Sequence, residues 1–298
     1  MIWLLGDVHS HFDHIEQAID AAAVKPVAVI FLGDIEAPIP LWECCAGIEK
    51  RGVDWYWVIG NHDTDTKENF ANVSDAKSVA HNIDGKVVTI DVPLPRGGGA
   101  QGAGVSSIRV AGLGSIFRGE VWHPDLHDGK PTHATYQDYE KHIRSNANLK
   151  RRLSPKDLAQ MQAVPPENRQ WNSAVLDQSR IGKLLKHRST IYPDAYEKLA
   201  DQKADILVTH EAPSCHPHGF KEIDLLAQVM GVKVAVHGHH HDALDYSRAW
   251  DTLGFKAYGV GFCGITSYAP KTGLIETVAP GDFDEQRRYR EQHGMGPE

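Results

Sequence analysis

Short apolar runs alternate with segments of helical spacing over residues 1–63. Three of these runs predict buried strands: Ile2–Asp7, Pro26–Asp34 and Val53–Asp63. Apolar residues at helical spacing predict a helix after the first run: Phe12, Ile15, Ile19 and Ala22. Ser10, three residues before Asp13, is the expected N-cap of this helix. Residues 41–52 predict a second helix, and the β-α-β-α-β order predicts parallel strands joined by helical crossovers.

Further strands are predicted on either side of a long segment whose apolar residues have helical spacing. They span residues 85–93, 106–115, 204–213, 232–241 and 256–264. The Gly-rich residues 95–104 predict a flexible hairpin tip rather than a phosphate cradle, because no helix follows them. From about 116 to 203, helical spacing broken by Pro and Asn predicts a helical insertion. We therefore expect one domain over 1–281, with a cap-like insertion at about 116–203 and a charged tail at 282–298.

The composition is typical of a water-soluble globular protein, with 41% hydrophobic and 23% charged residues in a chain of 298. No apolar stretch is long enough to span a bilayer, and the first residues lack the basic region of a signal peptide. A cytoplasmic location is therefore expected. The four cysteines form no C-x-x-C pair, which disfavours a zinc–thiolate site and disulfide staples.

Residue types that bind metals follow five of the predicted strands. The five segments are Asp7-Val8-His9, Gly33-Asp34, Gly60-Asn61-His62-Asp63, Thr209-His210-Glu211 and Gly238-His239-His240-His241. Each segment alone would fit a polar turn or a solvated loop. In an open α/β sheet, however, the carboxyl ends of the strands meet at one edge, so residues remote in sequence converge there. The five segments together predict a metal site.

The donor types indicate which metals this site would bind. Asp, His and Asn offer carboxylate, imidazole and amide oxygen without thiolate, a set that suits Mn, Fe, Zn, Ni or Mg. A carboxylate has two oxygens and is able to bridge two cations, and paired cations form a clamp for displacement at phosphorus. Asp34 is the natural bridge, which would explain why a carboxylate lies directly at the end of a buried strand.

The combined pattern resembles the calcineurin-like metallophosphoesterases, whose motifs run D-x-H, G-D, G-N-H-[DE], H and G-H-x-H. The match covers most of the chain outside the insertion. The resemblance implies an α/β fold, a four-layer αββα sandwich of two mixed sheets. It also implies two divalent metal ions, with manganese as the first expectation. One ion would be held by Asp7, His9, Asp34 and His241, and the other by Asp34, Asn61, His210 and His239.

The same resemblance implies a mechanism. A hydroxide bridging the two metals would attack phosphorus in line. His62 would bind neither metal and would protonate the leaving oxygen or stabilise its charge, and Asp63 would orient the His62 ring. One departure is clear: the G-D-x-x-D-R-G motif of the protein Ser/Thr phosphatases is replaced by G-D-I-E-A-P-I. This departure disfavours a eukaryote-type protein phosphatase.

Two residues are expected to contact substrate, Arg118 and His237. Arg118 follows the strand of residues 106–115, and a guanidinium is suited to bidentate phosphate contact. An ordinary surface arginine is an equal alternative. In the run Val236–Asp242, strand alternation and the G-H-x-H motif select His239 and His241 as ligands and leave His237 below the site. The alternative takes His237 and His239 as ligands. His11 and His240 are expected either to contact ligand residues or to face solvent.

The expected function is a metal-dependent phosphoesterase acting on a phosphomonoester or a small phosphodiester. The net charge is −8, yet residues 117–190 hold 13 Lys/Arg and 8 Asp/Glu. A basic insertion fits a cap over an anionic small-molecule substrate, although solvated helix faces fit equally. The alternatives are a protein Ser/Thr phosphatase, a nuclease and a non-catalytic scaffold. The acidic body disfavours extended nucleic acid, and the complete ligand set disfavours the scaffold.

Overall fold

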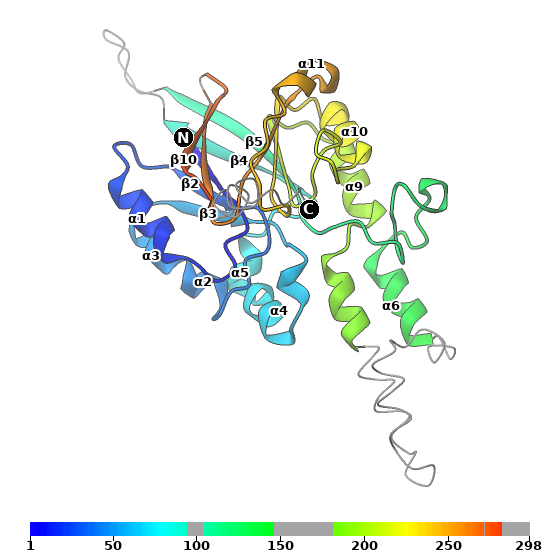
Figure 1. Ribbon diagram of the computed structural model, residues 1–298. Coiled ribbons are helices and arrows are strands. Elements are labelled where there is room, and N and C mark those ends of the chain that lie inside the picture. The colour runs from blue at the N-terminus through cyan, green and yellow to red at the C-terminus, as the bar shows by residue number, and fades with distance from the viewer. Residues whose placement is uncertain (94–103, 146–180, 271, 282–298) are drawn as a thin grey trace, which may run out of the picture.

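The computed structural model describes residues 1–93, 104–145, 181–270 and 272–281 (Figure 1). The predicted hairpin tip at 95–104 lies almost entirely outside these residues, as do residues 146–180 of the predicted insertion and the predicted tail at 282–298. Each helix among the described residues falls short of the length and apolar character that a membrane span requires.

Two five-stranded sheets form the centre of the fold. The first has the order β10-β9-β1-β2-β3 and the second the order β4-β5-β6-β7-β8. In the first sheet β1, β2 and β3 are parallel, and β9 and β10 join as antiparallel strands. In the second sheet β5 to β8 are parallel and β4 is antiparallel. The predicted class, a sandwich of two mixed sheets, is confirmed.

The strands are short at the centre of each sheet and longer at one edge. The first sheet comprises β1 (Ile2–Leu5), β2 (Ala28–Phe31), β3 (Asp54–Trp57), β9 (Ile265–Ala269) and β10 (Leu274–Ala279). The second comprises β4 (Lys86–Pro93), β5 (Val105–Leu113), β6 (Ile206–Thr209), β7 (Val234–His237) and β8 (Lys256–Gly259).

The helices connect and cover these sheets. The first half of the chain contributes α1 (Asp13–Ala21), α2 (Leu41–Cys44), α3 (Ala46–Lys50), η1 (His62–Thr64), α4 (Lys67–Ser74) and α5 (Ala76–Ala80). The second half contributes η2 (His127–Gly129), α6 (Tyr136–Ser145), η5 (His187–Ser189), α9 (Pro193–Ala200), α10 (Lys221–Met230), η6 (Ser247–Ala249) and α11 (Trp250–Leu253).

Alternation along the buried strands produces four layers. Ile2 and Leu4 of β1 pack between the two sheets, together with Ile206 and Val208 of β6. The alternate residues of β1 face the other way, where they pack with side chains from α1 and α3. Since successive side chains of a strand point to opposite faces, an all-apolar strand buries both. The outer face of the second sheet packs similarly against α9 and α10, and Figure 1 shows the helices on the two outer sides.

Part of the predicted insertion joins this outer layer. Tyr139 and Ile143 of α6 share one hydrophobic cluster with Leu207 of β6 and Met230 of α10. In Figure 1, α6 and the helical residues just before η5 lie side by side below the sheets. The described part of the insertion is therefore packed onto the second sheet rather than separate from it.

Several local expectations were wrong. Ser10 does not cap α1: its hydroxyl donates to the carbonyl of Glu36 at 2.5 Å, and Phe12 occupies the N-cap position without a side-chain cap. The helix predicted over 41–52 is divided into two short helices at Cys45. The predicted strand at 256–264 ends at Gly259, and the chain then returns as β9 and β10, which were missed.

One buried histidine of the insertion generates a prediction about acid stability. Burial lowers the pKa of His187 to about 3, although Glu120 opposes this shift from 3.7 Å. A histidine with a depressed folded pKa favours the folded state above its unfolded pKa of about 6.5, and this contribution is lost as the pH falls toward 3. Between about pH 7 and about pH 5, His187 should therefore lower the free energy of unfolding by roughly 2 kcal/mol.

The measurement is urea unfolding of the wild type and His187→Gln at both pH values. Other histidines titrate in both proteins, so the double difference isolates His187. The wild type should lose more stability than the variant on acidification. Equal losses in the two proteins would contradict the assignment.

Candidate metal centre

The register of the parallel strands brings the predicted segments to one edge. Leu5, Phe31 and Trp57, the last residues of β1, β2 and β3, are partners across the first sheet. Thr209 and His237 end β6 and β7 as partners in the second sheet. The loops after these strands meet between the sheets, as the 3.7 Å contact of Asp7 Oδ1 with His210 Nδ1 records.

The backbone of these loops is unusual. His9, Asp34, His239 and His241 all have positive φ, with values of 39°, 47°, 71° and 54°. Non-glycine residues seldom adopt this conformation, and it concentrates at functional sites. This conformation turns the backbone sharply in the loop after each strand, so that the side chains point back toward the shared edge.

Two motif glycines allow the loops to approach closely. A Cβ on Gly60 would lie 2.0 Å from the backbone nitrogen of Asp34, and one on Gly33 would lie 2.4 Å from His210 Nδ1. Gly33 also has a φ of +100°. Only glycine tolerates both conditions, so the glycines of these motifs serve the packing of the site.

Two groups of potential ligands lie side by side. His9, Asp34 and His241 form the first, and Asp34, His210 and His239 form the second; the ligand atoms of each group lie within 4.8 Å of one another. The Nε2 atoms of His9 and His241 are 3.1 Å apart. Asp34 belongs to both groups.

The other two expected ligands adjoin the second group. Asn61 Oδ1 lies 3.1 Å from His210 Nε2, which is also 3.3 Å from Asp34 Oδ2. Asp7 accepts a hydrogen bond at Oδ1 from the backbone N–H of His239 at 3.0 Å. The structure thus brings all seven expected metal ligands to one place.

His210 contacts the buried carboxylates of both Asp7 and Asp34, at 3.7 and 3.3 Å. Burial raises the pKa of Asp7 well above its ordinary value. Burial also opposes ionisation of Asp34, but His210 lowers the pKa of Asp34 below its ordinary value. In turn, burial disfavours the charged form of His210, while Asp34 and Asp7 raise its pKa to about 10. In the absence of a metal, a proton on His210 therefore compensates for buried negative charge.

Three buried atoms at this edge lack hydrogen-bond partners among the described residues: Asp7 Oδ2, Asp34 Oδ2 and His239 Nδ1. Buried polar atoms are normally satisfied. Asp34 Oδ2 does lie 3.3 Å from His210 Nε2, as an ion pair. Carboxylate oxygens and an imidazole nitrogen that converge with so few donors fit divalent cations, so the residues present suit the metals that the sequence implies.

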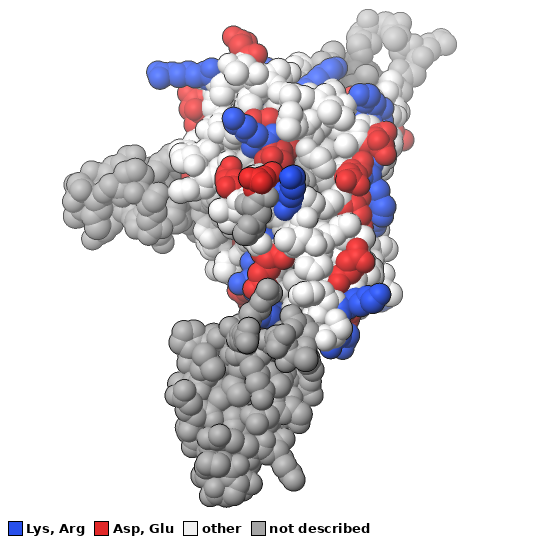
Figure 2. Space-filling view, turned by 90° about the vertical axis from the view of Figure 1, so that its right-hand side faces the viewer, with Lys and Arg blue, Asp and Glu red and all other residues white. Residues whose placement is uncertain are grey.

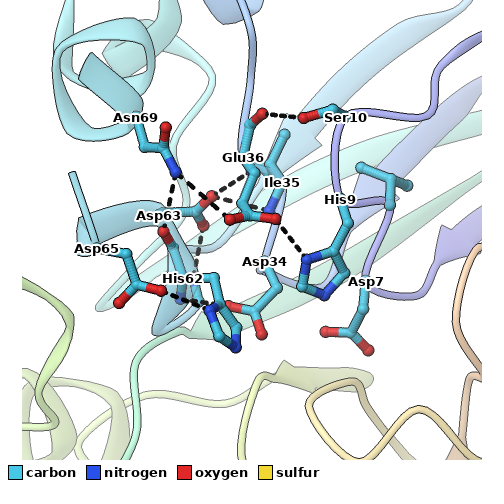
Figure 3. A network of polar contacts seen from close by, with 12 residues as sticks. Asp7, His9, Ser10, Asp34, Ile35, Glu36, His62, Asp63, Asp65 and Asn69 are labelled. Carbon is cyan, nitrogen blue, oxygen red and sulfur yellow. Dashed lines mark hydrogen bonds and ion pairs between the residues drawn. The ribbon is translucent and has the colours of Figure 1, made fainter. Parts of the chain in front are cut away.

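Neighbouring groups orient two of the ligand imidazoles. His9 Nδ1 contacts Glu36 Oε2 at 2.6 Å (Figure 3). His210 Nδ1 lies 2.8 Å from the carbonyl oxygen of Leu32. In both rings, Nε2 is therefore the nitrogen that would bind a metal. Outer partners of this kind fix the tautomer and the orientation of ligand histidines. Glu36 was not predicted, although its place two residues after Asp34 is a usable signal.

The expected role of Asp63 is not what the structure shows. Its carboxylate is buried and accepts three backbone N–H groups at 2.8 Å, from Ile35, Glu36 and Gly60. The ring of His62 contacts Asp65 instead, with Nδ1 2.6 Å from Oδ2. In a 3₁₀ turn, side chains three residues apart lie on the same side. For this reason η1 places Asp65, rather than Asp63, beside the His62 ring (Figure 3).

The environment of His62 favours its charged form. Burial opposes protonation, but the carboxylates of Asp34 and Asp65 together raise the pKa of His62 above its ordinary value. Its backbone N–H donates to Asp34 Oδ1 at 2.8 Å. His62 thus lies next to both ligand groups while belonging to neither of them.

The histidines at the end of β7 and in the loop after it take distinct positions. His239 and His241 lie in the two ligand groups. His237 is 1% exposed, and its Nδ1 and Nε2 are 2.8 Å from Gly238 O and 3.0 Å from the Tyr246 hydroxyl. This position does not suit the substrate contact expected for His237. His240 stacks on His216, with ring centroids 3.8 Å apart.

Arg118, near the start of the insertion, is half-buried and lies close to the metal edge. Its Nη2 donates to Ser189 Oγ at 3.3 Å, and Nε has no hydrogen-bond partner among the described residues. Burial lowers the pKa of Arg118, whereas Asp65, Glu211 and Asp34 act in the opposite direction. Glu211, which was not predicted to take part, accepts a hydrogen bond from the backbone N–H of Phe117 at 2.9 Å. This contact fixes the chain next to Arg118.

Comparisons with known proteins agree with the motifs. The model of the calcineurin-like phosphoesterase family matches residues 1–243. An uncharacterized protein of Haemophilus influenzae is 31% identical over 280 residues, which cover 93% of this chain and 98% of that protein.

Solved structures of two phosphoesterases also match. One is a calcineurin-like phosphoesterase from Bacillus subtilis, with 11% identity, a TM-score of 0.40, and coverage of 99% of this chain and 96% of that one. The other is a dimetal phosphatase from Danio rerio, with 14% identity, a TM-score of 0.36, and coverage of 93% and 98%.

The contacts of Asp63 predict a structural role. Asp63→Asn replaces one accepting oxygen by an NH₂ group that faces a backbone donor, so the free energy of unfolding should fall by roughly 1–3 kcal/mol. The measurement is urea unfolding of chelator-treated protein at about pH 8, because burial raises the pKa of Asp63 to about 7. Asp65→Asn, in an exposed pair, is the control and should cost at most about 1 kcal/mol. Equal losses in the two variants would contradict this role.

Proposed function

The chain belongs to the calcineurin-like phosphoesterase family, and on that premise we propose that it hydrolyses a phosphomonoester or a small phosphodiester with two divalent metal ions. The observation that carries the proposal is Asp34, a buried carboxylate shared by two adjacent ligand groups. Its Oδ2 has no hydrogen-bond partner among the described residues. A shared carboxylate between two groups of nitrogen and oxygen donors is what a dinuclear centre requires.

The ligand assignment follows the motifs. One cation would be held by Asp7, His9, Asp34 and His241, and the other by Asp34, Asn61, His210 and His239. Manganese is the first cation to test, and Fe, Zn, Ni and Mg also suit mixed nitrogen and oxygen donors. When bound, such cations polarise phosphate oxygens and lower the pKa of water, which supplies a nucleophile near neutral pH.

The residues of the chain bind the phosphate and move the proton. Arg118 would hold phosphate oxygens, because a guanidinium makes paired hydrogen bonds to them. His62 would give a proton from its ring to the leaving oxygen as the phosphorus–oxygen bond breaks. Its raised pKa keeps that proton available near neutral pH.

The substrate we propose is a phosphorylated small molecule. Residues 1–281 would form one domain, with the described part of the insertion as one wall of the substrate site, since Ser189 of η5 contacts Thr64 of η1 through their hydroxyl oxygens at 2.6 Å. Basic and acidic side chains are interspersed on the face shown in Figure 2, without a broad basic patch there. That face gives no support to an extended nucleic-acid footprint. The four cysteines, all of which lie among the described residues, form no disulfide, in keeping with a cytoplasmic enzyme.

The first test of this function is Asp34→Asn. The wild type should contain two equivalents of metal and hydrolyse members of a phosphate ester panel. The variant should bind less metal and lose activity, because each ligand group loses a shared carboxylate. Asp251→Asn, an exposed position on α11, is the matched control and should behave as wild type. Elemental analysis that finds only trace metal in active wild-type protein would end the proposal.

A histidine series tests the ligand register. His239→Ala and His241→Ala should each lose metal and activity, His237→Ala should lose less of both, and His240→Ala least. The reason is that His237 is held by Tyr246, away from the ligand groups. Calorimetric titration of the metal-free variants with Mn²⁺ measures the bound equivalents. If His237→Ala lost an equivalent of Mn²⁺ that His241→Ala retained, the ligands would be His237 and His239 rather than His239 and His241.

A further inference from the structure

We propose that Asp65 is the positioning residue for His62 and holds its imidazole in the tautomer and orientation needed for proton transfer to the leaving oxygen. The inference rests on the proposed phosphoesterase function and assigns to Asp65 the role that the motif pattern gave to Asp63. Two features carry it: a short contact of the ring with the Asp65 carboxylate, and a backbone frame that holds both residues.

The contact is made by the atom that decides the tautomer. His62 Nδ1 lies 2.6 Å from Asp65 Oδ2, the distance of a charge-assisted hydrogen bond. A carboxylate at Nδ1 keeps the proton on that nitrogen, so Nε2 is the atom left to act on a substrate. Figure 3 shows the His62 ring between Asp65 on one side and Asp34 on the other.

The backbone around the pair is held at several points. The N–H of His62 donates to Asp34 Oδ1 at 2.8 Å, and its carbonyl oxygen accepts from Asn69 Nδ2 at 3.3 Å. Thr64 contacts Ser189 of the insertion through their hydroxyl oxygens at 2.6 Å. These contacts fix the turn, so the position of Asp65 relative to the ring follows from the turn geometry.

The neighbouring carboxylates are committed elsewhere. Glu36 lies 2.6 Å from His9 Nδ1, and Asp63 is saturated by three backbone N–H groups. The His9 and His62 ring centroids are only 5.3 Å apart. Two carboxylate–imidazole pairs therefore stand side by side, one serving an expected metal ligand and the other the expected acid.

The proton balance of the step is simple. Protonated His62 carries N–H groups at both ring nitrogens, and Nε2–H transfers its proton to the leaving oxygen while the phosphorus–oxygen electron pair moves to that oxygen. Neutral His62 then keeps Nδ1–H on Asp65. The carboxylate does not take the proton, and it acts only through the ring.

The pair is well suited to mutational analysis because it is exposed. The side chains of His62 and Asp65 are 42% and 57% accessible, so their pairing contributes little to stability. A loss of function on substitution of Asp65 would then reflect orientation rather than unfolding. Glu68, an exposed acid of α4 three residues farther along the chain, provides a matched removal of negative charge.

The kinetic test compares p-nitrophenyl phosphate, which has a good leaving group, with phenyl phosphate, which has a poor one, using Mn²⁺-loaded full-length protein. His62→Ala should lower kcat for phenyl phosphate by roughly 10²–10⁴-fold. Asp65→Asn should lower it by roughly 10-fold or more, but by less than His62→Ala, with little change in KM and a smaller loss for p-nitrophenyl phosphate. Asp65→Glu should recover part of the loss, and Glu68→Gln should behave as wild type.

A double variant distinguishes a role through the ring from a separate role. If Asp65 acts through His62, adding Asp65→Asn to His62→Ala should lower kcat no further. The inference would be overturned if the kcat losses of the two single variants multiplied in the double variant. It would also be overturned if Asp65→Asn lowered kcat equally for the two esters. If His62→Ala loses activity and Asp65→Asn does not, the inference fails while the proposed function stands. Inactive metal-loaded wild type would overturn both.

A spectroscopic readout is independent of turnover. In ¹⁵N-labelled Mg²⁺-loaded protein, the ring nitrogen signals of His62, assigned by their absence in His62→Ala, should report a protonated Nδ1. Asp65→Asn should shift those signals while bound metal stays at the wild-type amount. Unchanged His62 signals would overturn the inference. So would the loss of one metal equivalent, which would instead make Glu36, His62 and Asp65 ligands of a further cation.

Discussion

The buried negative charge that two loops bring between the sheets is the constraint on which the site depends. Asp7 and Asp34 are 0% and 1% exposed, and His210 is the only buried base within 4 Å of either among the described residues. Burying a carboxylate without compensation is costly, so such charges are paired or coordinate metals. The divalent cations that we propose would supply the compensating charge, and in their absence a proton on His210 substitutes in part.

The rest of the fold can be understood as the means of holding that charge in place. Apolar residues on both faces of β1, β2, β6 and β7 anchor the central strands between the helical layers. The strands end in register, and positive φ values together with motif glycines then turn the loops inward. The ligands are therefore positioned by strands that lie within the core. Mobile side chains alone would not keep seven donors together.

The sequence predicted the parts of the site that depend on short stretches of chain. Asp7, Asp34 and Asn61 each follow a buried strand within a few residues, so strand pattern and parallel order were enough to bring them together. The motif spacing also placed His239 and His241. What it did not predict depends on local turn geometry or distant contacts. A 3₁₀ turn places Asp65, for which no role was expected, beside the His62 ring in place of Asp63, and the buried His237 contacts the Tyr246 hydroxyl. The predicted strand pattern ends at Gly264, so it does not include β9 and β10.

The central claim is that Asp34 bridges two cations, and anomalous diffraction from crystals of the Mn²⁺-loaded protein tests it most directly. The account predicts two anomalous peaks roughly 3.5–4 Å apart, each at bonding distance from a different oxygen of Asp34, with His9 and His241 on one and His210 and His239 on the other. A single peak, or two peaks of which Asp34 contacts at most one, would contradict it.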